Sequence, residues 1–303
     1  MSARSTLSRL DASAPVTAVD DDQDAARARA RSRRRGLVLF PRVAVAVVIV
    51  STWEIGTRLG CYGRDTATCV IDKFFYGQPS GIWSQLVTWV QDGTSQGPLW
   101  EQIFVTLEET VLGFAIGVVL GIAFGVLLGR NRLLSDVAGP YIKAFNAMPR
   151  VVLGSIFIIA LGFDIPSKVA LAVVLVFFVV FFNAFQGVRE VDRDLLANAR
   201  ILGASQRQLS MHVILPSALS WIIASLHTSF GFALVGAIVG EYLGAKKGIG
   251  LLIAHAQGTF NANGVYAAML ILAIVAIIAE ALVTRLENAL IRWRPNATAE
   301  VTF

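Results

Sequence analysis

A small set of ionisable side chains lies in or beside long apolar stretches of this sequence, where charge is expensive in lipid. Its members are Glu54, Glu108, Glu109, His227, Glu241 and Glu280. His227 and Glu241 belong to the expected fifth membrane helix, so they are our candidates for lining a solute pathway. The other glutamates lie near the expected helix ends, within reach of water, and we interpret them as boundary residues.

Motifs for catalysis are missing from the sequence. It has no G-x-x-x-x-G-K-[ST] phosphate loop, no H-E-x-x-H zinc motif and no cysteine and histidine set with metal-ligand spacing. The stretch GAKKGIG at 244–250 holds glycines and lysines, but its spacing and its expected position outside the membrane do not suit a nucleotide. The sequence therefore predicts no enzyme, no metal site and no cofactor bound by this chain.

Composition places most of the chain in lipid. Of its 303 residues 55% are hydrophobic and 16% are charged, and the mean hydropathy is +0.64. Such an apolar excess has no water-soluble arrangement at this length. The net charge of +5 does not indicate nucleic acid binding, because the arginines cluster beside apolar stretches instead of forming a basic domain with interleaved aromatic residues. We expect an integral membrane protein.

Apolar runs predict the membrane-spanning helices. They occupy 36–56, 111–129, 151–163, 168–188, 218–240 and 265–284. The third run is short and follows Pro140 and Pro149, so a re-entrant segment is the alternative to a crossing. Counting it as a crossing places most lysines and arginines on the side of the N-terminus, as the positive-inside rule requires. We predict an all-α membrane protein with a bundle of six transmembrane helices, the third beginning near Tyr141 and kinked at Pro149.

The remaining segments give the predicted domain organisation. Residues 1–35 carry many charges and few large apolar side chains, so we expect a disordered basic cytoplasmic tail. Residues 36–294 form the transmembrane domain, with an external loop at 57–110 and a cytoplasmic loop at 189–217. Residues 295–303 form a cytoplasmic C-terminal tail.

The external loop contains its own pattern. GIWSQLVTWV, at 81–90, predicts an amphipathic interfacial helix with Trp83 and Trp89 as membrane anchors. Cys61 and Cys69 lie in the same loop, where a disulfide and two free thiols are both open alternatives.

The second apolar run carries glycines at four-residue spacing: Gly113, Gly117, Gly121, Gly125 and Gly129. On a helix, this spacing makes a groove that another backbone can approach closely. Packing against a helix of the same chain is the favoured interpretation. A subunit interface or a moving contact is the alternative.

A polar stretch, DLLANARILGASQRQLSMHVILP at 194–216, separates two apolar runs. One helical pattern runs to Leu202, Gly203 interrupts it, and a second short helical pattern ends at Pro216. Two helices joined by a glycine-permitted bend would make a compact polar knob (residues 194–216) at the cytosolic face, suited to docking in a cleft of a soluble partner. An ordinary solvated loop is the alternative.

The knob resembles the cytoplasmic coupling motif of ABC importer permeases, whose pattern is E-A-A-x-x-x-G, nine residues, then I-x-L-P. Ala199 and Gly203 match, and VILP at 213–216 completes the pattern. Ala197 and Asn198 stand where the family has glutamate and alanine. This departure affects any salt bridge made by that glutamate and not the docking itself.

The likeness covers roughly residues 75–294. It includes PSGIW from Pro79, GFDIPSKVALAVVLVFF from Gly162, GVREVD from Gly187 and EYLGAKKGIGLLI from Glu241. It is strongest to permeases of the nitrate, sulfonate and taurine group. Members of that group import sulfonates, nitrate, aromatic acids and pyrimidine vitamin precursors, so the resemblance does not identify one solute.

The resemblance implies a multi-pass permease of the bacterial inner membrane with both termini in the cytoplasm. Two copies of the chain would form the pathway, and an extracytoplasmic substrate-binding protein would deliver a small anionic solute to it. A separate ATPase subunit, carrying ATP and Mg²⁺, would receive the knob in its cleft. A secondary transporter and a membrane scaffold for a soluble ATPase are the alternative functions, the first requiring inverted repeats and ion ligands.

The resemblance also implies roles within the knob. Gly203 would allow the bend, and the small Ala199 and Ala204 would permit close approach of the partner. Pro216, after Leu215, would terminate the knob and orient the fifth helix. The candidates for polar contacts with the ATPase are Arg200 and Arg207.

Overall fold

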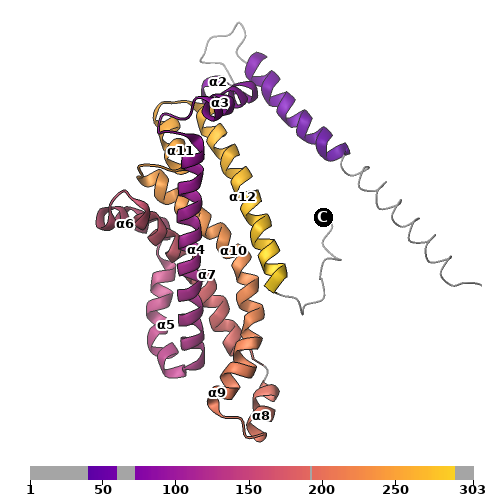
Figure 1. Cartoon of the computed structure of the whole chain (residues 1–303), viewed down its shortest axis with the longest axis vertical. Coiled ribbons are helices and arrows are strands. Elements are labelled where there is room, and N and C mark those ends of the chain that lie inside the picture. Colours follow the sequence, from indigo (N-terminus) through magenta and orange to yellow (C-terminus); the bar gives the residue numbers. More distant parts are fainter. Residues whose placement is uncertain (1–39, 60–71, 192, 291–303) are drawn as a thin grey trace, which may run out of the picture.

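A computed structural model describes residues 40–59, 72–191 and 193–290 (Figure 1). In these ranges the chain forms helices joined by loops, with an isolated β-bridge between Thr94 and Gly97. The predicted all-α membrane fold is confirmed. The two predicted tails, 1–35 and 295–303, lie outside the described residues, as do Cys61 and Cys69.

Five helices of the described residues are long and apolar enough to cross a membrane. They are Phe40–Leu59, α4 (Leu99–Arg130), α7 (Ile165–Arg189), α10 (Leu215–Leu243) with its extension back to Arg207, and α12 (Ala262–Leu290). Figure 1 shows α4, α7, α10 and α12 running side by side along the long axis of the molecule. Because α4 begins at Leu99, the last part of the predicted external loop, 99–110, is helix and not loop.

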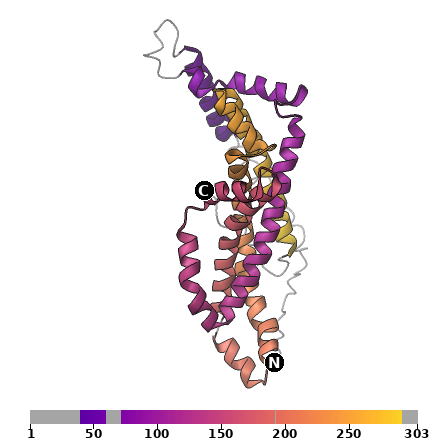
Figure 2. The ribbon, with the colours of Figure 1, turned by 90° about the vertical axis from the view of Figure 1, so that its left-hand side faces the viewer.

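The predicted third helix is a broken pair. Helix α5 (Arg132–Ala147) and helix α6 (Leu153–Leu161) are bent by 80° at the break, and a 3-10 turn, η2 (Arg150–Val152), lies between them. Figure 2 shows α5 running alongside the bundle and α6 turned across it. The break falls at Pro149, which has no N–H and favours an extended backbone at Met148, where φ is −69° and ψ is 142°.

This pair corrects two predictions about the third span. The helix begins at Arg132 and not near Tyr141, and the chain breaks at Pro149 where a kink was expected. Pro140 lies inside α5. By length and composition the described residues therefore hold five crossings, or six if the bent pair is one span.

The glycines of α4 lie against α7. A Cβ atom added to Gly117 would stand 2.7 Å from Cβ of Val176, and one added to Gly125 would stand 2.8 Å from the carbonyl oxygen of Phe181. Real Cβ atoms do not approach so closely, so glycine is what allows these two backbones to pack in contact. The facing residues on α7 are also four apart: Ala172, Val176, Val180, Ala184 and Val188.

A second group of helices covers the end of the bundle where α4 and α12 begin. It comprises α2 (Lys73–Tyr76), α3 (Pro79–Gln91) and α11 (Ile249–Gly258) (Figure 1). The predicted interfacial helix is α3, but its two tryptophans differ in their exposure to solvent. Trp83 is 68% exposed, whereas Trp89 is 8% exposed and packs in a core with Ile249 and Leu252, so Trp89 is a core residue and not a membrane anchor.

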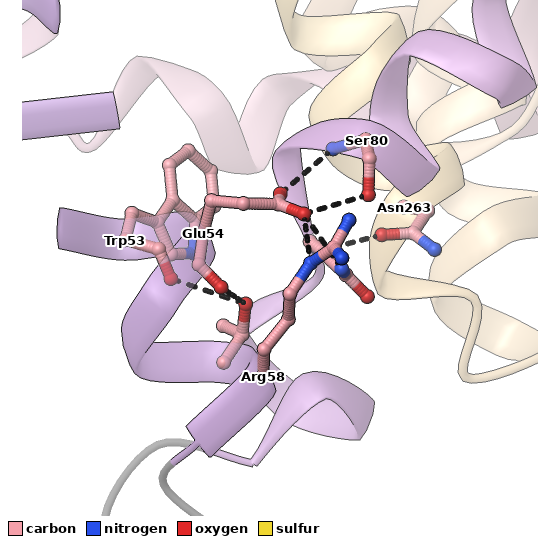
Figure 3. A network of polar contacts seen from close by, with 7 residues as sticks. Trp53, Glu54, Arg58, Ser80 and Asn263 are labelled. Carbon is pink, nitrogen blue, oxygen red and sulfur yellow. Dashed lines mark hydrogen bonds and ion pairs between the residues drawn. The ribbon is translucent and has the colours of Figure 1, made fainter. Parts of the chain in front are cut away.

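Glu54 ties the helix Phe40–Leu59 to this group (Figure 3). Its carboxylate accepts hydrogen bonds from Arg58 Nε at 2.6 Å, Gln78 Nε2 at 2.8 Å and the Ser80 amide at 3.0 Å. Asn263 Oδ1 on α12 accepts a hydrogen bond from the backbone amide of Gln78 at 2.8 Å. Glu54 therefore has polar partners at the end of its helix, where a boundary residue was expected.

Candidate functional site

The knob lies at the opposite end of the bundle (Figure 1). It begins with α8 (Arg193–Ile201), after which the chain turns through Gly203, where φ is +80°. The Ala204 amide donates to the Ala199 carbonyl at 3.0 Å and the Gly203 amide donates to the Arg200 carbonyl at 2.9 Å. These bonds form a Schellman cap, in which the left-handed residue is usually glycine. An added Cβ at Gly203 would meet nothing within 4 Å, so backbone conformation alone favours glycine there.

The second half of the knob continues into the membrane helix. A short helix, α9 (Gln206–Leu209), leads into a π-helical turn, η3 (Ser210–Ile214), and then into α10, so that Arg207–Leu243 is one helix of 37 residues. The Leu215 amide donates to the carbonyl five residues back, on Ser210. We attribute the wide turn to Pro216, whose ring cannot fit against the carbonyl four residues before it in a regular α-helix. The resemblance implied that Pro216 terminates the knob, but Pro216 lies inside a continuous helix.

The surface of the knob combines polar and apolar exposure. Arg200 and Arg207 are exposed, whereas Ala199, Ala204 and Leu215 are half-buried. Ile201 and Leu202, at the bend, are 82% and 86% exposed. Adjacent large apolar side chains that stand so far into solvent are typical of a surface that docks on another molecule.

A second polar site is buried among the membrane helices. It brings together Glu109 of α4, Lys168 of α7 and Glu241 of α10, none of which is more than 1% exposed. Glu241 accepts from the Thr106 hydroxyl and from the Gly250 amide, both at 2.6 Å. Charged groups at such depth persist only when they are paired or hydrogen-bonded.

The carboxyl groups of Glu109 and Glu241 lie in the same buried cluster, close enough to act electrostatically on one another. Glu109 Oε2 is fully buried and no N–H or O–H of another described residue is placed to donate to it. A buried carboxyl oxygen without a donor is costly, so Glu109 is less well satisfied than Glu241, which has two donors.

Lys168 has its own set of acceptors. Its ammonium donates to the carbonyl oxygens of Phe163 and Asp164, at 2.6 and 3.2 Å, and to the Ser167 hydroxyl at 3.2 Å. These three acceptors match the three donors of an ammonium group. The positive charge is thus held at the start of α7, close enough to act electrostatically on Glu109 and Glu241.

The GAKKGIG loop, 244–250, closes over this cluster. The Gly248 amide donates to Gln102 Oε1 at 2.8 Å and the Ile249 amide donates to the Thr106 hydroxyl at 2.9 Å. Gly248 has a φ of +120°, and a Cβ atom there would collide with the Glu241 carboxyl group, so only glycine fits. The loop's glycines serve a close backbone approach and not a phosphate.

Two ion pairs fasten the same loop at the surface. Lys246 Nζ lies 2.8 Å from Asp164 Oδ1, and Lys247 Nζ lies 2.5 Å from Glu101 Oε1. The hydrogen bond from Lys246 holds the pKa of Asp164 below its usual range. The loop is therefore connected to α4 and to the turn before α7 by contacts outside as well as inside the bundle.

The structure separates the two pathway candidates. Glu241 belongs to the buried cluster, whereas His227 lies elsewhere on α10, exposed, with Nε2 3.1 Å from Glu280 Oε1 of α12. Glu109, which we interpreted as a boundary residue, is buried in the cluster, so that interpretation is wrong. Sequence reasoning missed Thr106 and Lys168; the signal for Lys168 was a lone lysine at the start of an apolar run.

Comparisons with known proteins agree with this architecture. Residues 117–292 match the family model described as "Binding-protein-dependent transport system inner membrane component". The putative aliphatic sulfonates transport permease protein SsuC of Bacillus subtilis is 28% identical over 82% of this chain and 85% of its own length. The riboflavin transport system permease protein RibX of Chloroflexus aurantiacus is 33% identical over 67% of this chain and 75% of its own length.

A solved structure shares the fold. A chain of the MetNI methionine ABC transporter, in an inward-facing conformation, aligns with a TM-score of 0.56 and 19% identity, covering 63% of this chain and 95% of the other. The matched family region includes the knob, Lys168 and Glu241. The predicted resemblance is confirmed, and the chain belongs to the family of binding-protein-dependent transport system inner membrane components.

Proposed function

We propose that this chain is the membrane-spanning subunit of an ATP-driven importer for a small anionic solute of the sulfonate, taurine or nitrate type. The observation that carries the proposal is the knob, whose Gly203 bend presents exposed residues and whose second half is continuous with α10. The solute class is supported by the sulfonate permease, which matches over most of both chains. Another relative is named as a riboflavin permease, so relatives of this chain are named for different solutes.

The energy for import would come from a separate ATPase subunit that binds ATP and Mg²⁺. Ile201, Leu202 and Arg207 are exposed on the knob and would enter a cleft of that subunit. When ATP binding closes the ATPase pair, the knobs of two permease copies would move together. Because Arg207–Leu243 is one helix, this movement reaches Glu241 at its far end and can switch the pathway between inward and outward openings.

The knob end would face the cytoplasm, together with both termini. Arg130, Arg132, Arg189 and Arg207 lie at that end, which supports this orientation under the positive-inside rule. The end that carries the 244–250 loop would then face outward, toward a substrate-binding protein. A second copy of the chain, or the pathway itself, would face the exposed His227 and Glu280, since such a polar pair on membrane helices is unfavourable in lipid.

The test is a nucleotide-dependent cysteine cross-link. Leu202→Cys on the knob would be paired with cysteines in the cleft of a co-expressed candidate ATPase subunit, with Trp83→Cys at the other end as the matched control. We expect a cross-link from position 202 that changes in yield with ATP, and none from position 83. Absence of a product from several exposed knob positions would favour a secondary transporter.

Uptake measurements separate transport from scaffolding. Vesicles containing both subunits and a substrate-binding protein should hydrolyse ATP faster when the solute is present and should accumulate that solute. A cross-link without solute-stimulated hydrolysis or uptake would favour a membrane scaffold for an ATPase.

A further inference from the structure

A cavity of about 680 Å³ lies at the base of the knob. Three arginines from three separate elements line it: Arg130 at the end of α4, Arg132 at the start of α5 and Arg200 near the end of α8. None of the described residues that line the cavity is acidic. The site therefore gathers positive charge where the knob meets the α4–α5 turn.

The three guanidinium groups have no ion-pair partner within the described part of the chain. Three like charges around one cavity repel one another, and the repulsion falls when an anion enters between them. Guanidinium groups bind phosphate oxygens with paired N–H donors, which makes arginine the preferred residue for such an anion. The charge and the geometry together favour a phosphate group as the occupant.

Besides the three arginines and Gly129, Asn131 and Ser210, the side chains that line the cavity are apolar. The apolar side chains come from α4, α5, α7, α8, α9 and the π-helical turn: Leu127, Leu133, Val188, Leu196, Leu209 and Ile214. Leu127 and Leu133 are 52% and 74% exposed at the edge of the bundle. A free phosphate ion would gain nothing from these side chains, whereas the acyl chains of a lipid would cover them.

We propose that this cavity binds the phosphate of an anionic phospholipid, and that the bound lipid joins the knob to the membrane helices. Basic pockets between membrane helices near the cytoplasmic surface are suited to such headgroups. Arg200 belongs to the knob, while Arg130 and Arg132 belong to the bundle, so one phosphate held by all three bridges the two. Only the choice of the cytoplasmic leaflet rests on the proposed function.

The experiment titrates the full-length chain, purified in detergent and freed of lipid, with phosphatidylglycerol and follows binding by native mass spectrometry. The test variant is R130Q/R132Q/R200Q, and the charge-retaining variant is R130K/R132K/R200K. Arg285→Gln, an exposed arginine of α12 outside the cavity, is the control for general loss of charge. Phosphatidylcholine, which has a phosphate but no net charge, is the control lipid.

We expect the glutamine variant to bind phosphatidylglycerol at least about tenfold more weakly, because each arginine near an anionic lipid headgroup strengthens its binding. The lysine variant should keep part of the affinity and Arg285→Gln all of it. Equal binding by the wild-type chain and the glutamine variant would overturn the proposal. If the glutamine variant does not fold, single variants at Arg132 and Arg200 carry the same comparison against Arg285→Gln.

A second titration distinguishes the source of the phosphate. Inorganic phosphate at millimolar concentration, without lipid, should neither bind detectably nor displace phosphatidylglycerol. Arginine-dependent binding of phosphate alone, with displacement of the lipid, would assign the cavity to a soluble phosphate compound and overturn the lipid proposal.

Discussion

The hydroxyl group of Thr106 on α4 lies 2.6 Å from Glu241 Oε1 on α10, to which it donates. The Thr106 hydroxyl oxygen also accepts a hydrogen bond from the Ile249 backbone amide at 2.9 Å. One side chain thereby joins two membrane helices and the loop that closes over them. Because Thr106 is fully buried, no water is available to replace either partner.

Thr106→Val is expected to destabilise the chain by about 1–3 kcal/mol, since it keeps the shape but leaves a buried acceptor and a buried amide without partners. Thr106→Ser keeps the hydroxyl and should lose less. Thermal unfolding of the purified full-length chain measures both. Equal unfolding temperatures for the valine variant and the wild-type chain would show that the buried network does not contribute to stability.

Gly203→Val should impair coupling without preventing membrane insertion. A β-branched residue at a φ of +80° is strained by about 1–2 kcal/mol or more, and the strain is confined to the bend of the knob. Gly203→Asn, which tolerates that conformation better, should retain more activity. ATP-dependent cross-linking and uptake at matched protein abundance test this order. Gly203→Asp, which adds charge and bulk, is expected to hydrolyse ATP without coupled transport.

Gly125→Ala should lower stability by about 1–3 kcal/mol, because the new methyl group would press against the α7 backbone at Phe181, which cannot rotate away. Gly231→Ala on α10 is the matched control, since its Cβ would meet nothing within 4 Å. Thermal unfolding should separate the two substitutions. Similar unfolding temperatures for both would mean that α4 and α7 can move apart at low cost.

The pair Lys246–Asp164 predicts a small pH dependence. The folded-state pKa of Asp164 is lowered from 3.8, chiefly by the Lys246 hydrogen bond, so the pair contributes stability above pH 3.8 and loses it as the pH falls through the folded value. Lys246→Gln should therefore unfold at a slightly lower temperature than wild type near neutral pH, and the difference should shrink below pH 3.8. A difference that grows with acidification would contradict this assignment. The effect is limited because both side chains are exposed.

Local sequence patterns predicted those parts of the fold that depend only on residues close together in the chain. The spacing of the α4 glycines indicated a close backbone contact, and Gly203 between two helical patterns indicated the bend. Both follow from helix periodicity and from the conformational freedom of glycine. Pro149 marked the break between α5 and α6, but no local pattern gives the 80° angle, which depends on packing.

The buried cluster required the tertiary fold. Glu109, Lys168 and Glu241 come from three helices, and in the sequence each is a lone charge near the end of an apolar run. Water at a helix end and a partner on another helix are equally good explanations for such a charge until the helices are placed. Pro216 shows the same limit, because a proline that ends many helices is accommodated here by a wider turn.

That wider turn also sets the direction in which the knob points. Each residue of an α-helix advances the chain by about 100° around the axis, and a π turn inserts an extra residue into that count. The azimuth of the knob about the α10 axis, relative to the face that carries Glu241, is thus determined by residues 210–214. Deleting one residue there would keep every docking side chain on the knob. It would also rotate the knob by about 100° around the α10 axis, so that those side chains face a different direction in the membrane plane.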